Sequence, residues 1–253
     1  MKIEALRAKG EQTLHDAVMA YAYTEIANIF SAFTWYLRAG QEERAFEKLW
    51  SRKESIAYVS CGKGYRGQES VRAFFVTARK KQREEKLPML AELFPDQVKN
   101  APEYLGAGDY EMHWLTTPYI RVANDLKTAK GAWWSPGIVA ETDTDGNLRS
   151  YVRTINYGCD FILEDGAWKI WHLREFAEFS YPLEENLLDM QGREQNFGAA
   201  LELTRRMSTG IPKPNERRKW SGPCTRTKIP GMIPDILEPY NTWDDCLSCI
   251  RDL

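Results

Sequence analysis

The sequence predicts an α+β protein in which helices come first and a curved antiparallel sheet follows. Two observations support this fold class. Apolar residues recur every three or four positions in the first part of the chain, which is typical of amphipathic helices. From residue 110 onward, long runs of aromatic and β-branched residues are separated by turn sequences, DGN at 145–147 and EDG at 164–166. Tight turns join antiparallel neighbours, so these runs are expected to form a meander.

The first predicted helix covers residues 14–38. Thr13, with Asp16 three positions later, resembles a capping box at its start, and Gly40 suits a position just after its end. The apolar positions follow helical spacing: Val18, Ala22, Ile26, Ile29, Phe33 and Leu37. This helix is therefore expected to bury one face.

Shorter elements are expected before the sheet. A second helix ends near Trp50, and β-branched and aromatic residues over 55–60 predict a strand. Residues 62–67 suggest a turn, and apolar spacing predicts a third helix over 68–85. Three prolines and two glycines make residues 87–108 look like a loop with a short helical piece.

Four strands are expected over residues 110–122, 128–142, 149–163 and 167–179. Five of the nine Trp lie between residues 114 and 171, which places much of the aromatic content on the sheet. Adjacent residues of a strand point to opposite faces, so Trp133 and Trp134 send one indole to each side.

Residues 183–253 are expected to extend domain 1–182 without forming a second domain. Residues 185–207 could form a helix, continuous or interrupted at Gly192. Six of the 12 prolines lie between Pro212 and Pro239, where apolar residues have no regular period. Such a segment has no core of its own and is expected to lie extended over the domain or across a neighbouring subunit. We therefore expect a homo-oligomer, a dimer or higher, whose interface the C-terminal arm contributes to.

Composition narrows the classes of partner. With 34 basic and 36 acidic residues, the net charge of -2 gives no electrostatic case for nucleic acid. No apolar run is long enough to span a membrane, and the polar N-terminal residues contain no signal-peptide core. We therefore expect no membrane partner and a cytoplasmic location, with the five Cys reduced. Cys246 and Cys249 form a CxxC pair without two further zinc ligands nearby, so we assign neither metal nor cofactor.

Two motifs carry a family resemblance. Residues 112–122 read MHWLTTPYIRV and are followed by DLKTA at 125–129. This resembles the pattern H-x-x-x-x-P-x-I-x-V…D-x-x-T-A of SnoaL-like proteins in the nuclear transport factor 2-like superfamily. The sequence DGAWKI at 165–170 is similar to that family's G-x-W-[RK]-I strand opening. The order of elements also matches, so the resemblance covers about residues 10–182.

The resemblance implies a cone in which a strongly bent antiparallel sheet wraps around the long first helix. An apolar pocket at the open end would take a small apolar or aromatic ligand. Relatives include dehydratases, cyclases, isomerases and non-catalytic subunits, so the resemblance implies a pocket and not a reaction.

His113 occupies the position of the pocket histidine of family dehydratases. An imidazole suits proton transfer near neutral pH, and Tyr36 or Tyr157 would polarise a substrate oxygen. The alternative is a hydrogen-bonded, partly buried strand histidine without a catalytic role. A carboxylate or tyrosine hydroxyl within about 3.2 Å of the His113 ring would favour catalysis, whereas a His113 outside the sheet would exclude it.

The acid partner departs from the family pattern. Family dehydratases usually carry an Asp just after the first helix, where this chain has none. Their other common acid lies in Tyr-x-Asp on the fourth strand, but here Asp160 is one residue further from Tyr157. In a regular strand this shift places Asp160 on the opposite face, unless a bulge at Gly158 restores it. Asp160 is kept as a candidate catalytic residue on that condition.

Five residues are candidates for substrate binding. His172 and Arg174 alternate in register with Trp168 and Ile170 on the last strand. If that face lines the cone, Arg174 would hold a carboxylate or phenolate; otherwise the two form a solvent-facing pair. The aromatic candidates, for which core packing is the alternative, are Trp133, Tyr58 and Trp114.

The leading hypothesis is a cofactor-independent lyase or isomerase, resembling a dehydratase, that acts on a cyclic or aromatic small molecule by His general acid/base catalysis. The alternative is a non-catalytic small-molecule-binding protein or assembly subunit that uses the same cone. A sheet-face subunit of a larger oxygenase is a further alternative.

Overall fold

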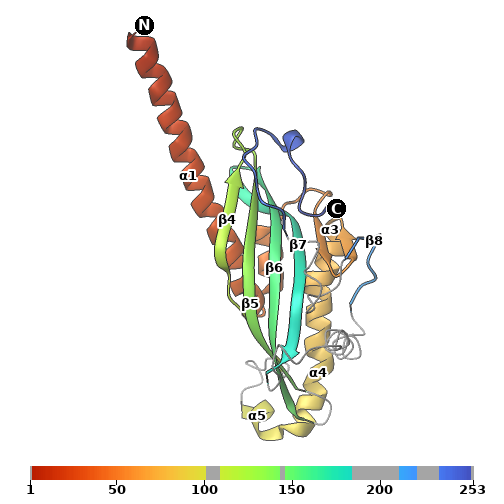
Figure 1. Ribbon diagram of the computed structural model, residues 1–253. Helices are drawn as coiled ribbons and strands as arrows, with labels where there is room; N and C mark the ends of the chain where they lie inside the picture. The colour runs from red at the N-terminus through yellow and green to blue at the C-terminus, as the bar shows by residue number, and fades with distance from the viewer. Residues whose placement is uncertain (1, 101–108, 143–145, 184–210, 221–233, 252–253) are drawn as a thin grey trace.

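The computed structural model describes residues 2–100, 109–142, 146–183, 211–220 and 234–251 (Figure 1). The N-terminal half is mainly helical. Its elements are α1 (Lys2–Arg38), α2 (Glu42–Leu49), the strands β1 (Ala57–Ser60) and β2 (Lys63–Arg66), α3 (Gln68–Arg72), a π-helical stretch (Ala73–Ala78), α4 (Arg79–Leu93) and α5 (Pro95–Asn100).

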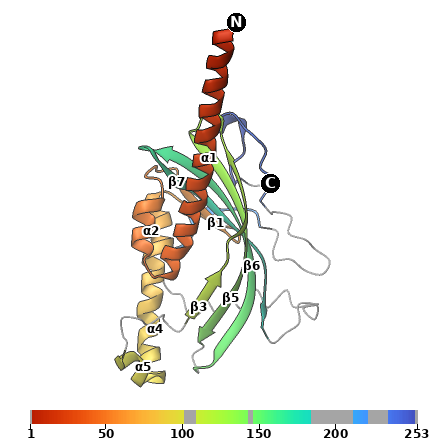
Figure 2. The same cartoon turned by 90° about the vertical axis from the view of Figure 1, so that its left-hand side faces the viewer.

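The remaining strands join β1 and β2 in one sheet of eight described strands. They are β3 (Asp109–His113), β4 (Thr116–Val122), β5 (Thr128–Thr142), β6 (Leu148–Glu164), β7 (Ala167–Pro182) and β8 (Glu216–Arg217). The order is β3-β5-β6-β7-β1-β2-β8, with β4 also paired to β5. All pairs are antiparallel except β1 with β7. The α+β class and the antiparallel meander are confirmed, and the sheet is curved but not closed (Figure 2).

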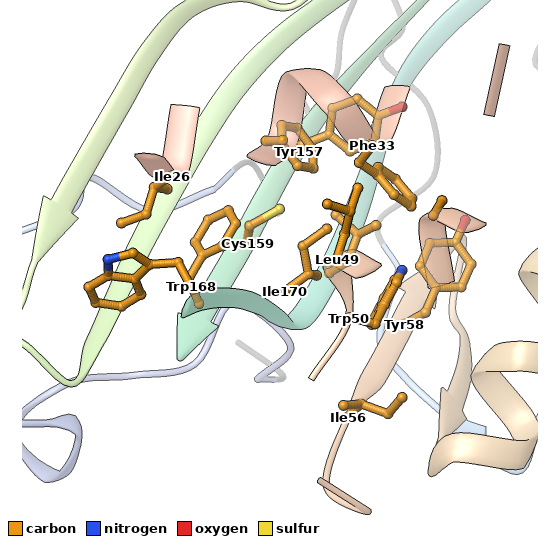
Figure 3. Packing of buried hydrophobic residues seen from close by; sticks show 14 of the residues in the cluster. Ile26, Phe33, Leu49, Trp50, Ile56, Tyr58, Tyr157, Cys159, Trp168 and Ile170 are labelled. Atoms are coloured by element: carbon orange, nitrogen blue, oxygen red, sulfur yellow. The ribbon is translucent and has the colours of Figure 1, made fainter. Parts of the chain in front are cut away.

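The core lies between the helices and the concave face of this sheet (Figure 2). Phe30 of α1 is fully buried, with its ring centroid 4.3 Å from that of Trp133 and 5.2 Å from that of Tyr157. Phe33 and Trp50 extend the cluster toward α2, and Figure 3 shows them beside Tyr157 and Tyr58. Burying one such side chain contributes about 1.5–3 kcal/mol. The C-terminal half of α1 is therefore the element that the sheet curves around.

Two helices are longer than the sequence predicts. The structure starts α1 at Lys2, so Thr13 is not an N-cap; its hydroxyl donates to the Lys9 carbonyl inside the helix at 2.9 Å. The third helix does not end at residue 85, because α4 continues to Leu93 through Pro88. Pro88 lacks a backbone N–H, yet the helix continues past this exposed residue, so the prediction of a loop over 87–93 is wrong.

The predicted turn and first long strand also differ from the structure. The turn at 62–67 is restricted to Cys61 and Gly62, both with positive φ, and β2 follows immediately. The run predicted over 110–122 is interrupted at Trp114, so β3 and β4 pair separately with β5.

The C-terminal extension adds to this sheet. Residues 216–217 form β8 on the edge of β2, and the segment 234–251 (the C-terminal segment) lies against the convex face. Tyr119 donates to the Leu237 carbonyl at 2.8 Å, and the Asn124 and Asp125 amides donate to carbonyls of Tyr240 and Asn241. The helix expected over 185–207 lies outside the described residues. None of the helices in the described ranges is long and apolar enough to cross a membrane.

We predict that Phe30→Ala lowers the free energy of unfolding by about 3–5 kcal/mol, because it removes a fully buried ring that joins α1 to β5 and β6. Denaturant titration followed by tryptophan fluorescence measures this change. Leu148→Ala is the control, since Leu148 is 67% exposed; equal losses in both variants would contradict the packing described here.

Candidate functional site

One bulge in β7 decides which face its polar residues occupy. Phe161 pairs with Ile170, but the neighbouring Asp160 pairs with His172, so Trp171 is an extra residue. An extra residue reverses the alternation of side chains beyond it. Ile170 therefore lies in the core on the concave side, while His172 lies with Asp160 on the convex side.

The expectation that His172 and Arg174 share a face with Trp168 and Ile170 is therefore wrong. No bulge interrupts the pairing of Gly158 with β5 or β7, so Asp160 stays on the face opposite to Tyr157. The condition for Asp160 to reach a concave site is not met. The chemistry of the molecule is thus divided between two faces of one sheet.

His113 lies on the concave face at the end of β3. It pairs with Gly137 of β5. Gly137 is four residues from the core residue Trp133 on the same strand, so both residues, and His113 with them, lie on the concave face. Its Nδ1 atom is 3.3 Å from the Ser135 carbonyl oxygen, and its side chain is only 8% exposed. A carbonyl only accepts, so this contact places the proton on Nδ1. Nε2 is buried and has no hydrogen-bond partner among the described residues.

Glu111 supplies a carboxylate to this ring. Residues two apart in a strand share a face, and Glu111 Oε1 lies 3.2 Å from His113 Nε2, an ion-pair distance without hydrogen-bond alignment. The guanidinium group of Arg153, on β6, lies 4.0 Å from the Glu111 carboxylate. The same guanidinium lies 3.9 Å from the Glu141 carboxylate. Partial burial raises the pKa of Glu111, but His113 and the charges of Arg79 and Arg153 outweigh it and lower the pKa to about 2.

A second polar group occupies the concave face on β1 and β7. Glu175 accepts hydrogen bonds from Tyr58 and from Ser60, the latter at 3.2 Å. Burial raises the pKa of the Glu175 carboxyl, and Glu111 raises it further. Burial also raises the pKa of Tyr58 and of Tyr157 well above the usual range, so both phenols stay protonated. Glu111, His113, Glu175, Tyr58 and Tyr157 thus share one face of the sheet.

The remaining predicted residues lie elsewhere. Tyr36 packs at the edge of the core with the Arg44 guanidinium 5.7 Å from its ring. Among the described residues, no hydrogen bond or ion pair joins Tyr36 to His113. Trp133 is buried beneath Phe30, whereas Trp134 points to the other face and is 65% exposed. Trp114 is 44% exposed just beyond β3.

Asp160 is the centre of a buried network on the convex face. Lys130 donates to its carboxylate at 2.9 Å, and His172 Nδ1 and the Ser248 hydroxyl donate to it at 2.9 and 2.6 Å. The Cys249 amide donates to both carboxylate oxygens. Burial raises the pKa of Asp160, but the bonds from His172 and Ser248 and the Lys130 charge lower it to about 2. The network ties the C-terminal segment to β5, β6 and β7.

This constellation is not a nucleophilic triad. Ser248 donates to the carboxylate and not to a free imidazole nitrogen, and His172 Nε2 lies 3.2 Å from the Ser55 carbonyl. In a Ser-His-Asp triad the histidine stands between the other two groups. Arg174 likewise binds the segment, donating to the carbonyls of Arg251 at 2.5 Å and Lys219 at 3.0 Å.

A cavity of about 490 Å³ lies between the convex face and the C-terminal segment. Its charged lining residues include Lys130, Asp160 and Arg174, which are the residues that hold the segment in place. We therefore read the cavity as a space under the segment and assign the candidate site to the concave face.

The four cysteines that the structure describes show no sign of activation. Burial raises the pKa of Cys159 and Cys249 well above the usual range and raises that of Cys61 and Cys246 as well. In the part of the chain that is described, no group of three or more His, Cys, Asp or Glu is arranged to hold a metal ion.

Sequence reasoning missed four residues of the concave site: Glu111, Arg153, Glu175 and Arg79. A signal existed for Glu111, because it lies two positions before His113 on an expected strand and so shares its face. The others depend on pairing between distant strands and on the path of α4, which local pattern does not specify.

Comparisons with known proteins agree with the fold. Residues 19–174 match the family described as SnoaL-like domain, whereas a comparison with curated proteins finds no match. One similar solved structure is hexachlorocyclohexane dehydrochlorinase LinA-type3 from Novosphingobium barchaimii LL02. It has 17% identity and a TM-score of 0.43, with 68% of this chain and 96% of that chain covered.

Two further solved structures are similar. An NTF2-like protein with a cystatin-like fold from Novosphingobium aromaticivorans has 17% identity and a TM-score of 0.40, covering 68% of this chain and 88% of its own. An NTF2-like superfamily protein from Salmonella enterica serovar Typhimurium has 12% identity and a TM-score of 0.41, covering 66% and 98%. Similarities at this level transfer neither ligand nor reaction to this chain.

We predict that Asp160→Asn lowers the free energy of unfolding at pH 7 by about 3 kcal/mol, because Lys130 then lacks its buried counter-charge. The pKa of Asp160 is about 2 in the folded protein and about 3.9 when unfolded. Its contribution is therefore present at neutral pH and disappears as the pH falls from about 4 to about 2.

Urea titrations of both proteins between pH 7 and pH 3 measure the difference. Asp165→Asn is the control, since Asp165 lies in an exposed turn with φ 51°, which Asn tolerates. A gap between wild type and Asp160→Asn that stays constant down to pH 3 would contradict the role of the ionised carboxylate.

Proposed function

This chain belongs to the family of SnoaL-like domains, and we propose that it is a cofactor-independent lyase or isomerase acting on a cyclic or aromatic small molecule. The reaction would proceed by proton transfer at His113 on the concave face. The observation that carries the proposal is the state of the His113 ring: one nitrogen is fixed by the backbone and the other is buried, without a hydrogen-bond partner, beside a carboxylate.

The ring geometry favours a general base. With the Nδ1 proton directed at the Ser135 carbonyl, the lone pair of a neutral ring lies on Nε2. A substrate C–H placed at Nε2 would lose its proton to this nitrogen, and the ring would become an imidazolium. The same nitrogen would then return the proton to another carbon or to a leaving group, which gives an isomerase or a lyase respectively.

Glu111 would stabilise the charged ring. His113 and the charges of Arg79 and Arg153 lower the pKa of the Glu111 carboxyl, so this carboxyl is ionised when the ring carries its second proton. Its oxygen lies 3.2 Å from Nε2, so proton uptake by His113 completes an ion pair instead of creating an isolated buried charge. The side chain of Glu111 is 46% exposed, so it can move aside for a substrate and return.

The surrounding groups suit a substrate that develops negative charge on oxygen. Arg153 and Arg79 bring positive charge to the carboxylates of this face. Tyr157 is a neutral phenol that would donate to a carbonyl or enolate oxygen, whereas the Tyr58 hydroxyl already donates to Glu175. The charges of Glu175, Glu111 and Arg79 all shift the pKa of Tyr157. These groups therefore lie close enough to influence one another electrostatically.

We predict that His113→Ala lowers turnover about 10²–10⁴-fold, the range for loss of a general base. The wild type is incubated with a metabolite extract in deuterated buffer, and mass spectrometry identifies compounds that are consumed or gain deuterium. Once a substrate is identified, the variants are compared with that compound. Glu111→Gln is expected to reduce turnover by at least tenfold while retaining ligand binding.

His15→Ala is the matched control, because His15 lies on α1 and contacts the Asn124 carbonyl far from β3. Unchanged turnover in His113→Ala would remove the assigned mechanism. Compounds that bind the wild type but are neither consumed nor labelled would favour the alternative of a non-catalytic small-molecule-binding subunit.

A further inference from the structure

The N-terminal half of α1 projects beyond the rest of the molecule (Figures 1 and 2). All buried residues of α1 lie between Ala22 and Phe33. The last contacts toward the N-terminus are made by His15, whose Nε2 is 2.9 Å from the Asn124 carbonyl, and by Tyr23 near Pro118. Residues 2–14 thus extend α1 by about 20 Å beyond His15, at 1.5 Å per residue.

This projecting segment carries an exposed apolar stripe. Its members repeat at spacings of three and four residues, which places them on one side of the helix: Ile3, Leu6, Gly10, Leu14, Ala17 and Tyr21. The large ones are 66–83% exposed: Ile3 83%, Leu6 69%, Leu14 67% and Tyr21 66%.

The stripe faces away from the domain. At 3.6 residues per turn, it lies roughly opposite the positions of α1 that contact the sheet, Ala22, Ile26, Phe30 and Phe33. The sheet therefore leaves this stripe uncovered in a single chain. A helix of this length is marginal in water by itself, and Gly10 in its middle weakens it by about 1 kcal/mol relative to Ala.

The charges of the segment indicate what covers the stripe. Residues 2–10 contain three basic residues and one acidic residue, whereas residues 11–25 contain three acidic residues and no Lys or Arg. Two parallel copies would place like charges side by side. Two antiparallel copies place the basic part of each helix beside the acidic part of the other.

We propose that residues 2–25 of α1 pair antiparallel with the same residues of a second copy of this chain. The contact is isologous, since each helix presents the same stripe to the other. Centring the pair near residue 13 sets Leu6 against Tyr21 and Gly10 against Ala17. Small residues meet at Gly10 and Ala17, where the two backbones approach most closely. The two domains then lie at opposite ends of the helix pair.

The test is the mass of the full chain in solution by sedimentation equilibrium. The wild type is expected at twice the 29.2 kDa of one chain. The double variant Leu6→Glu with Leu14→Glu is expected to raise the dissociation constant at least tenfold while keeping the melting temperature of the domain. Ala5→Glu with Ala8→Glu is the control: it adds the same charge to exposed positions on the opposite side of the segment and should remain a dimer.

A charge swap tests the orientation. Lys2→Glu with Lys9→Glu should weaken the dimer, and adding Asp16→Lys with Glu25→Lys to the same chain should restore it. A wild type that sediments as a single chain at about 100 µM would overturn the proposal. A dimer that survives Leu6→Glu with Leu14→Glu would also overturn it, since the interface would then lie elsewhere.

Discussion

The ion pair between Lys130 and Asp160 is the constraint on which the convex side of the molecule depends. Both groups are almost completely removed from water, which costs several kcal/mol for each ion unless further partners satisfy them. His172 supplies one partner from the sheet, but Ser248 and the Cys249 amide come from the C-terminal segment. The pair is fully satisfied only when that segment lies on the sheet, so sheet and segment form one cooperative unit.

The C-terminal segment and its polar contacts occupy the convex face, and the proposed site lies on the concave face. Three residues expected to act in the site hold the C-terminal segment on the other face: the candidate acid Asp160 and the substrate-binding candidates His172 and Arg174. Carboxylates not expected from the family pattern, Glu111 and Glu175, stand on the concave side. A SnoaL-like sheet thus keeps a histidine and acidic groups on its concave face while the positions of the acids differ from the family pattern.

The sequence predicted the class of fold because its evidence is local: helical spacing in α1 and hairpin turns between β5, β6 and β7. It left the face of Asp160 open between regular alternation and a bulge at Gly158, and the structure has regular alternation there. The predicted face of His172 is wrong because Trp171 is an extra residue in β7, which places His172 on the opposite face. The pattern of apolar residues does not indicate this bulge. The sequence also placed the start of the first helix after Thr13, because that residue resembles an N-cap, whereas α1 begins at Lys2.

The late position of the C-terminal segment along the chain bears on how the protein is made. Residues 234–251 are synthesised after every strand from β1 to β7. The convex face is therefore exposed to solvent while those strands pair. An uncovered apolar sheet face at that stage would invite aggregation. Four polar side chains lie on this face before the segment covers it: Lys130, Asp160, His172 and Arg174. In the folded protein the same side chains bind the C-terminal segment. The same polar side chains are therefore on the sheet before the C-terminal segment covers it and after.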